Sequence, residues 1–114
     1  MKAVVAASRH WLDGEVIRDH LVQLPISSTV VVSNRPGGDS LVAKIAEEEM
    51  ALHVERIEVC EEDFKRKMLE ELNDEVDSAL FFCCSESEVE YIFSRYARNH
   101  RISTEVVIKS FEVQ

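Results

Sequence analysis

The chain has 114 residues, of which 46% are hydrophobic and 31% charged, as is typical of a single folded domain with one core. Thirteen Lys and Arg against 22 Asp and Glu give a formal net charge of −9, so the surface as a whole should repel nucleic acid and anionic membranes. No apolar run approaches the roughly 18 residues that span a bilayer, and residues 1–7 are too short for a signal peptide. We therefore expect a cytoplasmic protein without membrane contact and without strong nucleic-acid binding.

Strand-like and helix-like patterns alternate along the whole chain, with no linker or internal repeat between them. Strands are predicted over residues 2–7, 29–33, 54–59, 78–84 and 104–108. Helices are predicted to include residues 16–24, 41–50, 64–76 and 89–97, and a short tail follows at 110–114. Asp13 is placed to cap the first helix, which Pro25 ends. Charged residues interrupt the run at 54–59, which indicates an edge strand, whereas the very apolar run at 78–84 indicates a central one.

This alternation predicts a three-layer α/β/α Rossmann-like sandwich, with one domain over residues 1–114 and a five-stranded, mostly parallel sheet in the order 3-2-1-4-5. In that order the topology reverses between the first and fourth strands, and such sheets bind ligands outside the carboxyl ends of their strands near the reversal. Ser8 and Arg9 follow the first strand there, and Ser85 follows the fourth. We expect these residues to converge on one crevice.

A glycine turn follows the second strand, in the sequence Asn34-Arg35-Pro36-Gly37-Gly38-Asp39. A strand, a glycine turn and a helix in this order can aim free backbone N–H groups at an anion, so we predict a phosphate-bearing ligand. No G-x-G-x-x-G occurs, and no Gly-Lys-Ser/Thr follows the turn, so no particular cofactor is predicted. The candidate ligand-binding residues are Ser8, Arg9, Arg35, Gly37, Gly38, Asp39 and Ser85.

Most of these residues also have a structural interpretation. Gly37 and Gly38 can serve only to make a turn with positive φ, and Asp39 is better explained as a helix cap than as a ligand contact. Trp11 is better explained as a lid on the core than as a platform for a base. Packing gives Arg9 no obvious duty, which makes it the strongest candidate.

The residues that metal binding or catalysis would need are not arranged for it. Cys60, Cys83 and Cys84 form no C-x-x-C pair, and the four histidines lack ligand spacing, so we predict buried structural cysteines and no metal. G-x-S-x-G is absent, and Ser8 and Ser33 have no evident His and Asp partners. No catalytic residue is assigned. A nucleoside or phosphoribosyl hydrolase would require Glu86 or Glu88 to reach the crevice.

Three segments carry a family resemblance: Ser8-Arg9-His10-Trp11-x-Asp13, Gly37-Gly38-Asp39-Ser40-Leu41-Val42-Ala43 and Lys67-Met68. Together they resemble the SLOG superfamily, the Rossmann-like group that includes cytokinin-activating phosphoribohydrolases, the DNA-processing protein A domain and small YspA-type proteins. With the order of elements, the resemblance covers nearly the whole chain and is closest to the YspA-type proteins. It implies a nucleotide-derived ligand at residues 8, 9 and 37–39.

The chain also departs from these relatives. The glycine turn is shorter than in YspA-type chains, and Arg66-Lys67 stands where they usually carry Arg-Asn. The phosphoribohydrolase signature Pro-Gly-Gly-x-Gly-Thr-x-x-Glu is matched only by Pro36-Gly37-Gly38, without a glutamate at the catalytic spacing. Hydrolase activity is therefore not carried over.

We thus predict a domain that binds a nucleotide or a nucleotide-derived small molecule in a sensing or regulatory role. The alternative is a non-enzymatic interaction or dimerisation domain that has lost the ligand, with Tyr91 and Tyr96 among its contact residues. Both interpretations are compatible with a homo-oligomer, which we expect.

Overall fold

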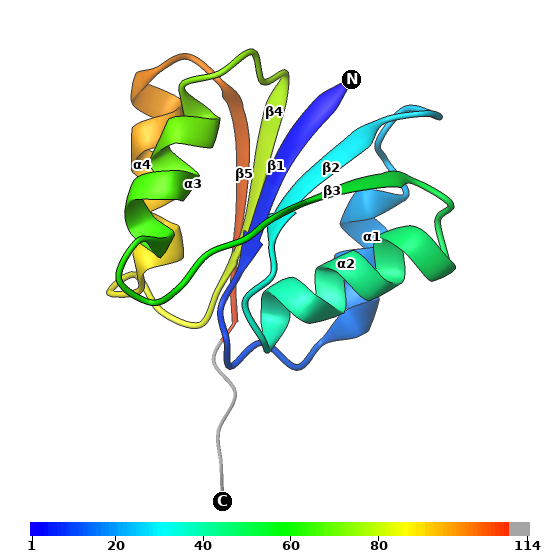
Figure 1. Ribbon diagram of the computed structural model, residues 1–114. Coiled ribbons are helices and arrows are strands. Elements are labelled where there is room, and N and C mark those ends of the chain that lie inside the picture. The colour runs from blue at the N-terminus through cyan, green and yellow to red at the C-terminus, as the bar shows by residue number, and fades with distance from the viewer. Residues whose placement is uncertain (110–114) are drawn as a thin grey trace, which may run out of the picture.

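The computed structural model describes residues 1–109 and confirms the predicted fold class. Its five strands pair in parallel in the order β3-β2-β1-β4-β5. Helices α1 and α2 cover one face of the sheet, and α3 and α4 cover the other (Figure 1). The strands are β1 (Lys2–Ala7), β2 (Thr29–Ser33), β3 (His53–Ile57), β4 (Ser78–Cys83) and β5 (Ser103–Ile108). The helices are α1 (Gly14–Leu21), α2 (Gly38–Glu48), α3 (Phe64–Leu72) and α4 (Val89–Asn99).

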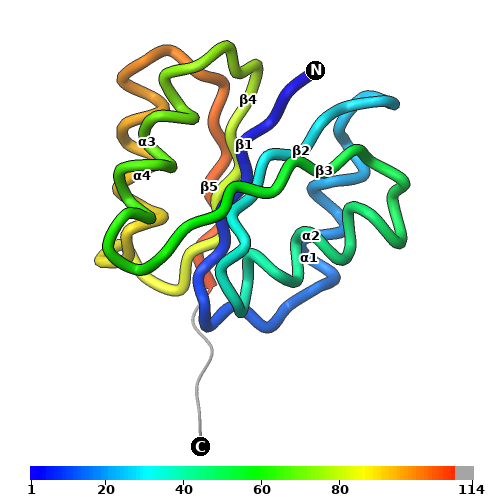
Figure 2. The backbone as a smooth tube through the Cα atoms, in the orientation of Figure 1, coloured from blue at the N-terminus to red at the C-terminus, as the bar shows by residue number. Residues whose placement is uncertain are grey.

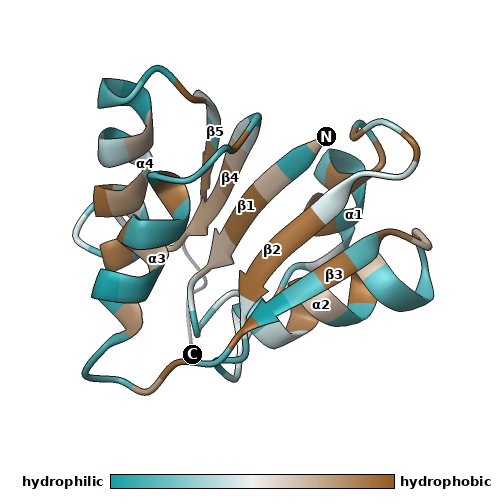
Figure 3. Ribbon diagram, turned by 45° about the horizontal axis from the view of Figure 1, so that its top comes forward, coloured by the Kyte–Doolittle hydropathy of each residue, from teal (hydrophilic) through white to brown (hydrophobic). Residues whose placement is uncertain are grey.

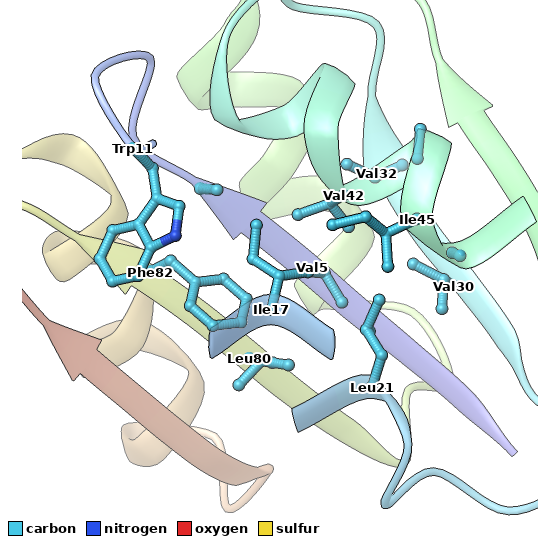
Figure 4. Close-up of a cluster of buried hydrophobic side chains, with 13 residues drawn as sticks. Val5, Trp11, Ile17, Leu21, Val30, Val32, Val42, Ile45, Leu80 and Phe82 are labelled. Carbon is cyan, nitrogen blue, oxygen red and sulfur yellow. The ribbon is translucent and has the colours of Figure 1, made fainter. Parts of the chain in front are cut away.

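The core has two parts because successive side chains of a strand point to opposite faces of the sheet. Val5 and Phe82 join the cluster beneath α1 and α2, shown in Figure 4, whereas Val4 and Phe81 join the cluster beneath α3 and α4. The central strands are therefore buried on both faces, as parallel strands usually are. The edge strands β3 and β5 alternate exposed and half-buried residues, and teal mixes with brown along β3 in Figure 3.

Several local predictions are confirmed. The Asp13 carboxylate caps α1 by accepting hydrogen bonds from the backbone N–H groups of Glu15 (3.1 Å) and Val16 (3.2 Å). Trp11 is buried against Phe82, with 5.3 Å between ring centroids, and so acts as a lid on the core. Cys83 is a free, fully buried thiol in β4, whereas Cys84 is half-buried and Cys60 is exposed, so the prediction of buried cysteines is wrong for Cys60.

Element ends differ by a few residues from the prediction. Helix α1 ends at Leu21 rather than near Pro25, and the edge strand runs over His53–Ile57 rather than residues 54–59. The predicted tail at 110–114 lies outside the described residues. In the part of the chain that the structure describes, none of the helices has the length and apolar character that crossing a membrane requires.

Candidate functional site

The turns after β1, β2 and β4 meet at the carboxyl edge of the sheet, as predicted. The backbone N–H of Ser8 donates to Phe82 O at the end of β4 (2.8 Å), and the N–H of Gly38 donates to Ser8 O (3.1 Å). Figure 2 shows the turns that follow β1 and β2 at this same end of the sheet. Residues far apart in the sequence are thus assembled around the point where the topology reverses.

The two glycines let the start of α2 approach the chain after β1 very closely. Gly37 has φ of +94°, and a Cβ on it would lie 2.5 Å from Arg9 O. A Cβ on Gly38 would lie 2.7 Å from Ala7 Cβ and would also collide with Ser8 O. Because the Gly38 amide already donates to Ser8 O, the expectation of an open helix N-terminus is wrong for this first amide. The turn serves close packing.

Asp39 is a buried bridge between two strands, and the prediction that it caps α2 is wrong. Gly37 occupies the cap position, and no side chain caps the helix. Asp39 points inward instead, where Oδ1 accepts from the backbone N–H of Ala7 (2.7 Å) and Oδ2 accepts from Ser33 Oγ (2.5 Å). Burial removes water from this carboxyl and raises its pKa from 3.8 to about 6, although the two hydrogen bonds and Arg35 favour the ionised form.

Arg35 fills the space next to Asp39. Its Nη2 donates to Ala7 O (3.0 Å) and to Glu90 Oε1 (2.5 Å), and its Nε lies 3.4 Å from Asp39 Oδ2. The guanidinium also stacks over the Phe64 ring at 3.9 Å. Two buried carboxylates thus share one cation, whose side chain is 11% exposed. The predicted ligand-binding side chain of Arg35 is occupied inside the protein.

Glu90 was not predicted as a site residue, although the sequence carries a signal for it. Glu90, Phe93 and Ala97 lie three and four residues apart, so the glutamate falls on the apolar stripe of α4. A charged residue on such a stripe usually needs a buried partner. Arg35 is that partner.

Ser8 and Ser85 are held by internal contacts as well. Ser8 is fully buried, and its hydroxyl donates to Glu88 Oε2 (2.7 Å). Glu88 Oε1 accepts from the backbone N–H groups of Cys84 (2.5 Å) and Ser85 (3.3 Å). The exposed Ser85 hydroxyl lies 2.7 Å from Ser87 Oγ. Glu88 therefore reaches the crevice between β1 and β4, where three donors of the protein hold its carboxylate.

An open pocket of about 210 Å³ lies beside this crevice, around the loops that follow β1, β2 and β3. Of the predicted residues, Arg9 and Arg35 line it. Arg9 Nη2 pairs with Glu61 Oε1 at 3.1 Å across the pocket, and the two side chains are 49% and 82% exposed. The lining residues are Arg9, Asn34, Arg35, Pro36, Val59, Cys60 and Glu61.

The part of this pocket that follows β3 was not predicted from the sequence. Asn34 Oδ1 accepts from the backbone N–H of Val59 (3.0 Å), and this bond ties the loop after β2 to the loop after β3. Polar residues in these loops gave no spacing that singled them out. Across residues 1–109, no group of three or more His, Cys, Asp or Glu side chains is arranged to hold a metal ion.

Fold and site together define a doubly wound parallel α/β protein. Its own charged side chains fill the point where the sheet topology reverses, and an open pocket lies next to that point. Comparisons of the chain with protein-family models, with curated proteins and with solved structures found no match.

Proposed function

We propose that this protein binds a nucleotide or a nucleotide-derived small molecule in the Arg9 pocket, in a sensing or regulatory role. The ligand's phosphate pairs with the Arg9 guanidinium, which can donate two parallel hydrogen bonds to an oxyanion. The observation that carries the proposal is an exposed arginine in an open pocket at the carboxyl edge of a doubly wound parallel sheet. This edge is where such sheets bind their ligands.

The contacts of Arg9 favour exchange with a ligand. An ion pair as exposed as Arg9 and Glu61 contributes only about 0 to 1 kcal/mol to stability, so an incoming phosphate can replace the glutamate at little cost. The pocket volume of about 210 Å³ is below the roughly 300–1,000 Å³ of most ligand sites. The pocket therefore encloses the phosphate-bearing end of a small ligand and leaves the remainder in solvent, which disfavours a dinucleotide.

The segments with the SLOG resemblance support the same ligand class. Residues 8–13 and 37–43 lie together at this edge through the hydrogen bond from Gly38 N to Ser8 O. We therefore keep membership of that superfamily as part of the proposal.

Calorimetric titration with AMP, ADP, ribose 5-phosphate and inorganic phosphate tests the proposal. We expect at least one phosphate ester to bind, and Arg9→Ala to weaken this binding about tenfold or more, the range of a lost charge-assisted pair. Arg18→Ala is the matched control, because Arg18 also makes an exposed ion pair, with Glu49 at 2.8 Å, and neither residue lines the pocket. No binding across the panel, or binding that Arg9→Ala leaves unchanged, would refute the proposal.

The second candidate is an interaction or dimerisation domain, and the filled crevice favours it. The Glu88 carboxylate occupies the reversal point, where an anionic ligand of this fold would sit, and the buried carboxylates of Asp39 and Glu90 lie beside it. Sedimentation velocity at micromolar concentration distinguishes this candidate: a dimer that persists without any nucleotide supports it, and a monomer excludes dimerisation as the function.

A further inference from the structure

The exposed cations of this acidic protein are unevenly distributed. Most lysines and arginines pair with a carboxylate within 4.0 Å, as Arg66 does with Glu70 and Lys67 with Asp63. Among residues 1–109, the cations without an ion pair are Lys44, Lys65, Arg95, Arg98 and Arg101. All of these except Lys44 lie on α3, on α4 or directly after α4. The unneutralised positive charge is therefore concentrated on one pair of helices.

A shallow groove of about 570 Å³ lies along α3 and meets α4 at Tyr96. Leu69 of α3 and Tyr96 of α4 are half-buried in it and pack on the core beneath. Ile92 lies one turn before Tyr96 on the same side of α4 and is 43% exposed. The groove is lined by Glu62, Lys65, Arg66, Leu69, Glu70, Asn73 and Tyr96. It thus combines an apolar floor with charged walls, as protein interfaces do.

We propose that this α3–α4 groove binds an acidic polypeptide segment that carries a large apolar side chain. The apolar side chain packs between Leu69 and Tyr96, and its flanking carboxylates meet Lys65 and Arg95. Unpaired cations attract such a segment without first breaking an internal ion pair. The groove shares no lining residue with the Arg9 pocket, so this inference does not depend on the ligand proposed above.

The charges of the groove favour a peptide over the other polyanions. Glu62 and Glu70 stand among the cations, so a continuous phosphate backbone would meet repulsion that a peptide with spaced carboxylates avoids. The formal net charge of −9 repels every anionic partner at long range, and this repulsion grows with the charge of the partner. It therefore weighs more against nucleic acid and against a second copy of the chain than against a short peptide.

Nuclear magnetic resonance titration of the ¹⁵N-labelled protein tests the proposal. The probe is a short synthetic peptide rich in glutamate that carries leucine and phenylalanine, and its counterpart has glutamine in place of every glutamate. We expect the acidic peptide to cause saturable shifts in the amides of α3 and α4, and the glutamine peptide to bind about tenfold more weakly or less. Added salt should weaken the binding of the acidic peptide, because salt screens the attraction between exposed charges.

Charge-reversal variants separate a local contact from the effect of net charge. Lys65→Glu and Arg95→Glu should each lower the affinity for the acidic peptide about tenfold or more, since each substitution places a negative charge against the carboxylates of the peptide. Lys44→Glu is the matched control, because Lys44 is also exposed and unpaired within the described residues and the net charge changes equally. This control should change the affinity less than about twofold.

Several outcomes would overturn the proposal. They are the absence of saturable shifts in α3 and α4, equal binding of the two peptides, and equal loss of affinity in the Lys44→Glu control. Tighter binding of oligouridine that Lys65→Glu abolishes would assign the surface to nucleic acid instead. Self-association that Lys65→Glu abolishes would assign it to a second copy. None of these results depends on nucleotide binding at Arg9.

Discussion

Two regions at the carboxyl edge of the same sheet differ sharply. The crevice between β1 and β4, at the reversal point, is filled by Glu88, and the buried network of Arg35, Asp39 and Glu90 lies beside it, where Asp39 bridges β1 and β2. The pocket beside it is open, and its charged pair, Arg9 and Glu61, faces solvent. Topology therefore determines the edge at which a ligand can bind, but side-chain packing determines which hollow of that edge stays open.

The filled crevice contains the donor groups that an anion would need. Two consecutive backbone N–H groups, of Cys84 and Ser85, and the hydroxyl of Ser8 converge on the Glu88 carboxylate. Backbone N–H groups and hydroxyls of this kind also hold bound oxyanions in proteins. An internal carboxylate satisfies them here, so these residues contribute to stability, whereas the Arg9 guanidinium makes an exposed ion pair with Glu61. The following predictions test this difference.

The largest effect on stability is expected at Gly38, which packs against the backbone of Ser8 beside the filled crevice. Gly38→Ala would push a Cβ into Ser8 O and to 2.7 Å from Ala7 Cβ, both on a buried segment. We expect the free energy of unfolding to fall by about 3 kcal/mol, as for severe overpacking. Urea denaturation measures it.

Gly14→Ala is the control for Gly38→Ala. Its Cβ would first meet Ile45 Cδ1 at 3.4 Å, an ordinary contact, and alanine favours the helix. Stability should therefore stay equal or rise by about 0.5 kcal/mol. Equal effects of the two substitutions would contradict the close approach at Gly38.

The second prediction concerns pH. Because burial raises the pKa of Asp39 from 3.8 to about 6, the folded state binds its proton more tightly than the unfolded state does. The stability from this group is fully present below pH 3.8 and is lost as pH rises through about 6. The difference corresponds to about 3 kcal/mol, at 1.36 kcal/mol per pH unit. Urea denaturation at a series of pH values measures it.

Asp39→Asn removes the titrating group and keeps an oxygen that can accept from Ala7 N or Ser33 Oγ. In this variant the fall in stability between about pH 3 and pH 7 should be about 3 kcal/mol smaller than in the parent protein. A variant whose pH profile parallels that of the parent would show that Asp39 is not the group that titrates there.

The third prediction addresses Glu88. Glu88→Ala leaves the N–H of Cys84 and the Ser8 hydroxyl without their acceptor, and we expect a loss of about 1 to 2 kcal/mol in urea denaturation. Glu86→Ala, at an exposed position in the same loop, should change stability by less than about 0.5 kcal/mol. Equal losses would mean that the carboxylate does not hold the crevice together.

The fold was predictable because its signals are local. Continuous apolar runs such as 78–84 identify buried parallel strands, and the alternation with helices limits the sheet to very few topologies. The residues of the crevice were predicted to lie together for the same reason. Their side-chain directions were not, because a glycine turn that approaches a phosphate and one that approaches a neighbouring backbone have the same sequence. Asp39 shows this: a residue in the first turn of a helix is typical of a cap, yet it points into the sheet.

The smallest effect on stability, and the clearest contrast with the crevice, is expected at Glu61. Removing this side chain frees Arg9 from its exposed ion pair, so Glu61→Ala should leave the free energy of unfolding within about 0.5 kcal/mol of the parent value. The same change removes the competitor for the guanidinium and should raise the affinity for a phosphate ester about two- to fivefold by calorimetry. Glu62→Ala, at the next position and outside the pocket lining, should leave the affinity unchanged. If both variants raise the affinity equally, the gain comes from net charge, and Arg9 is not the residue that holds the phosphate.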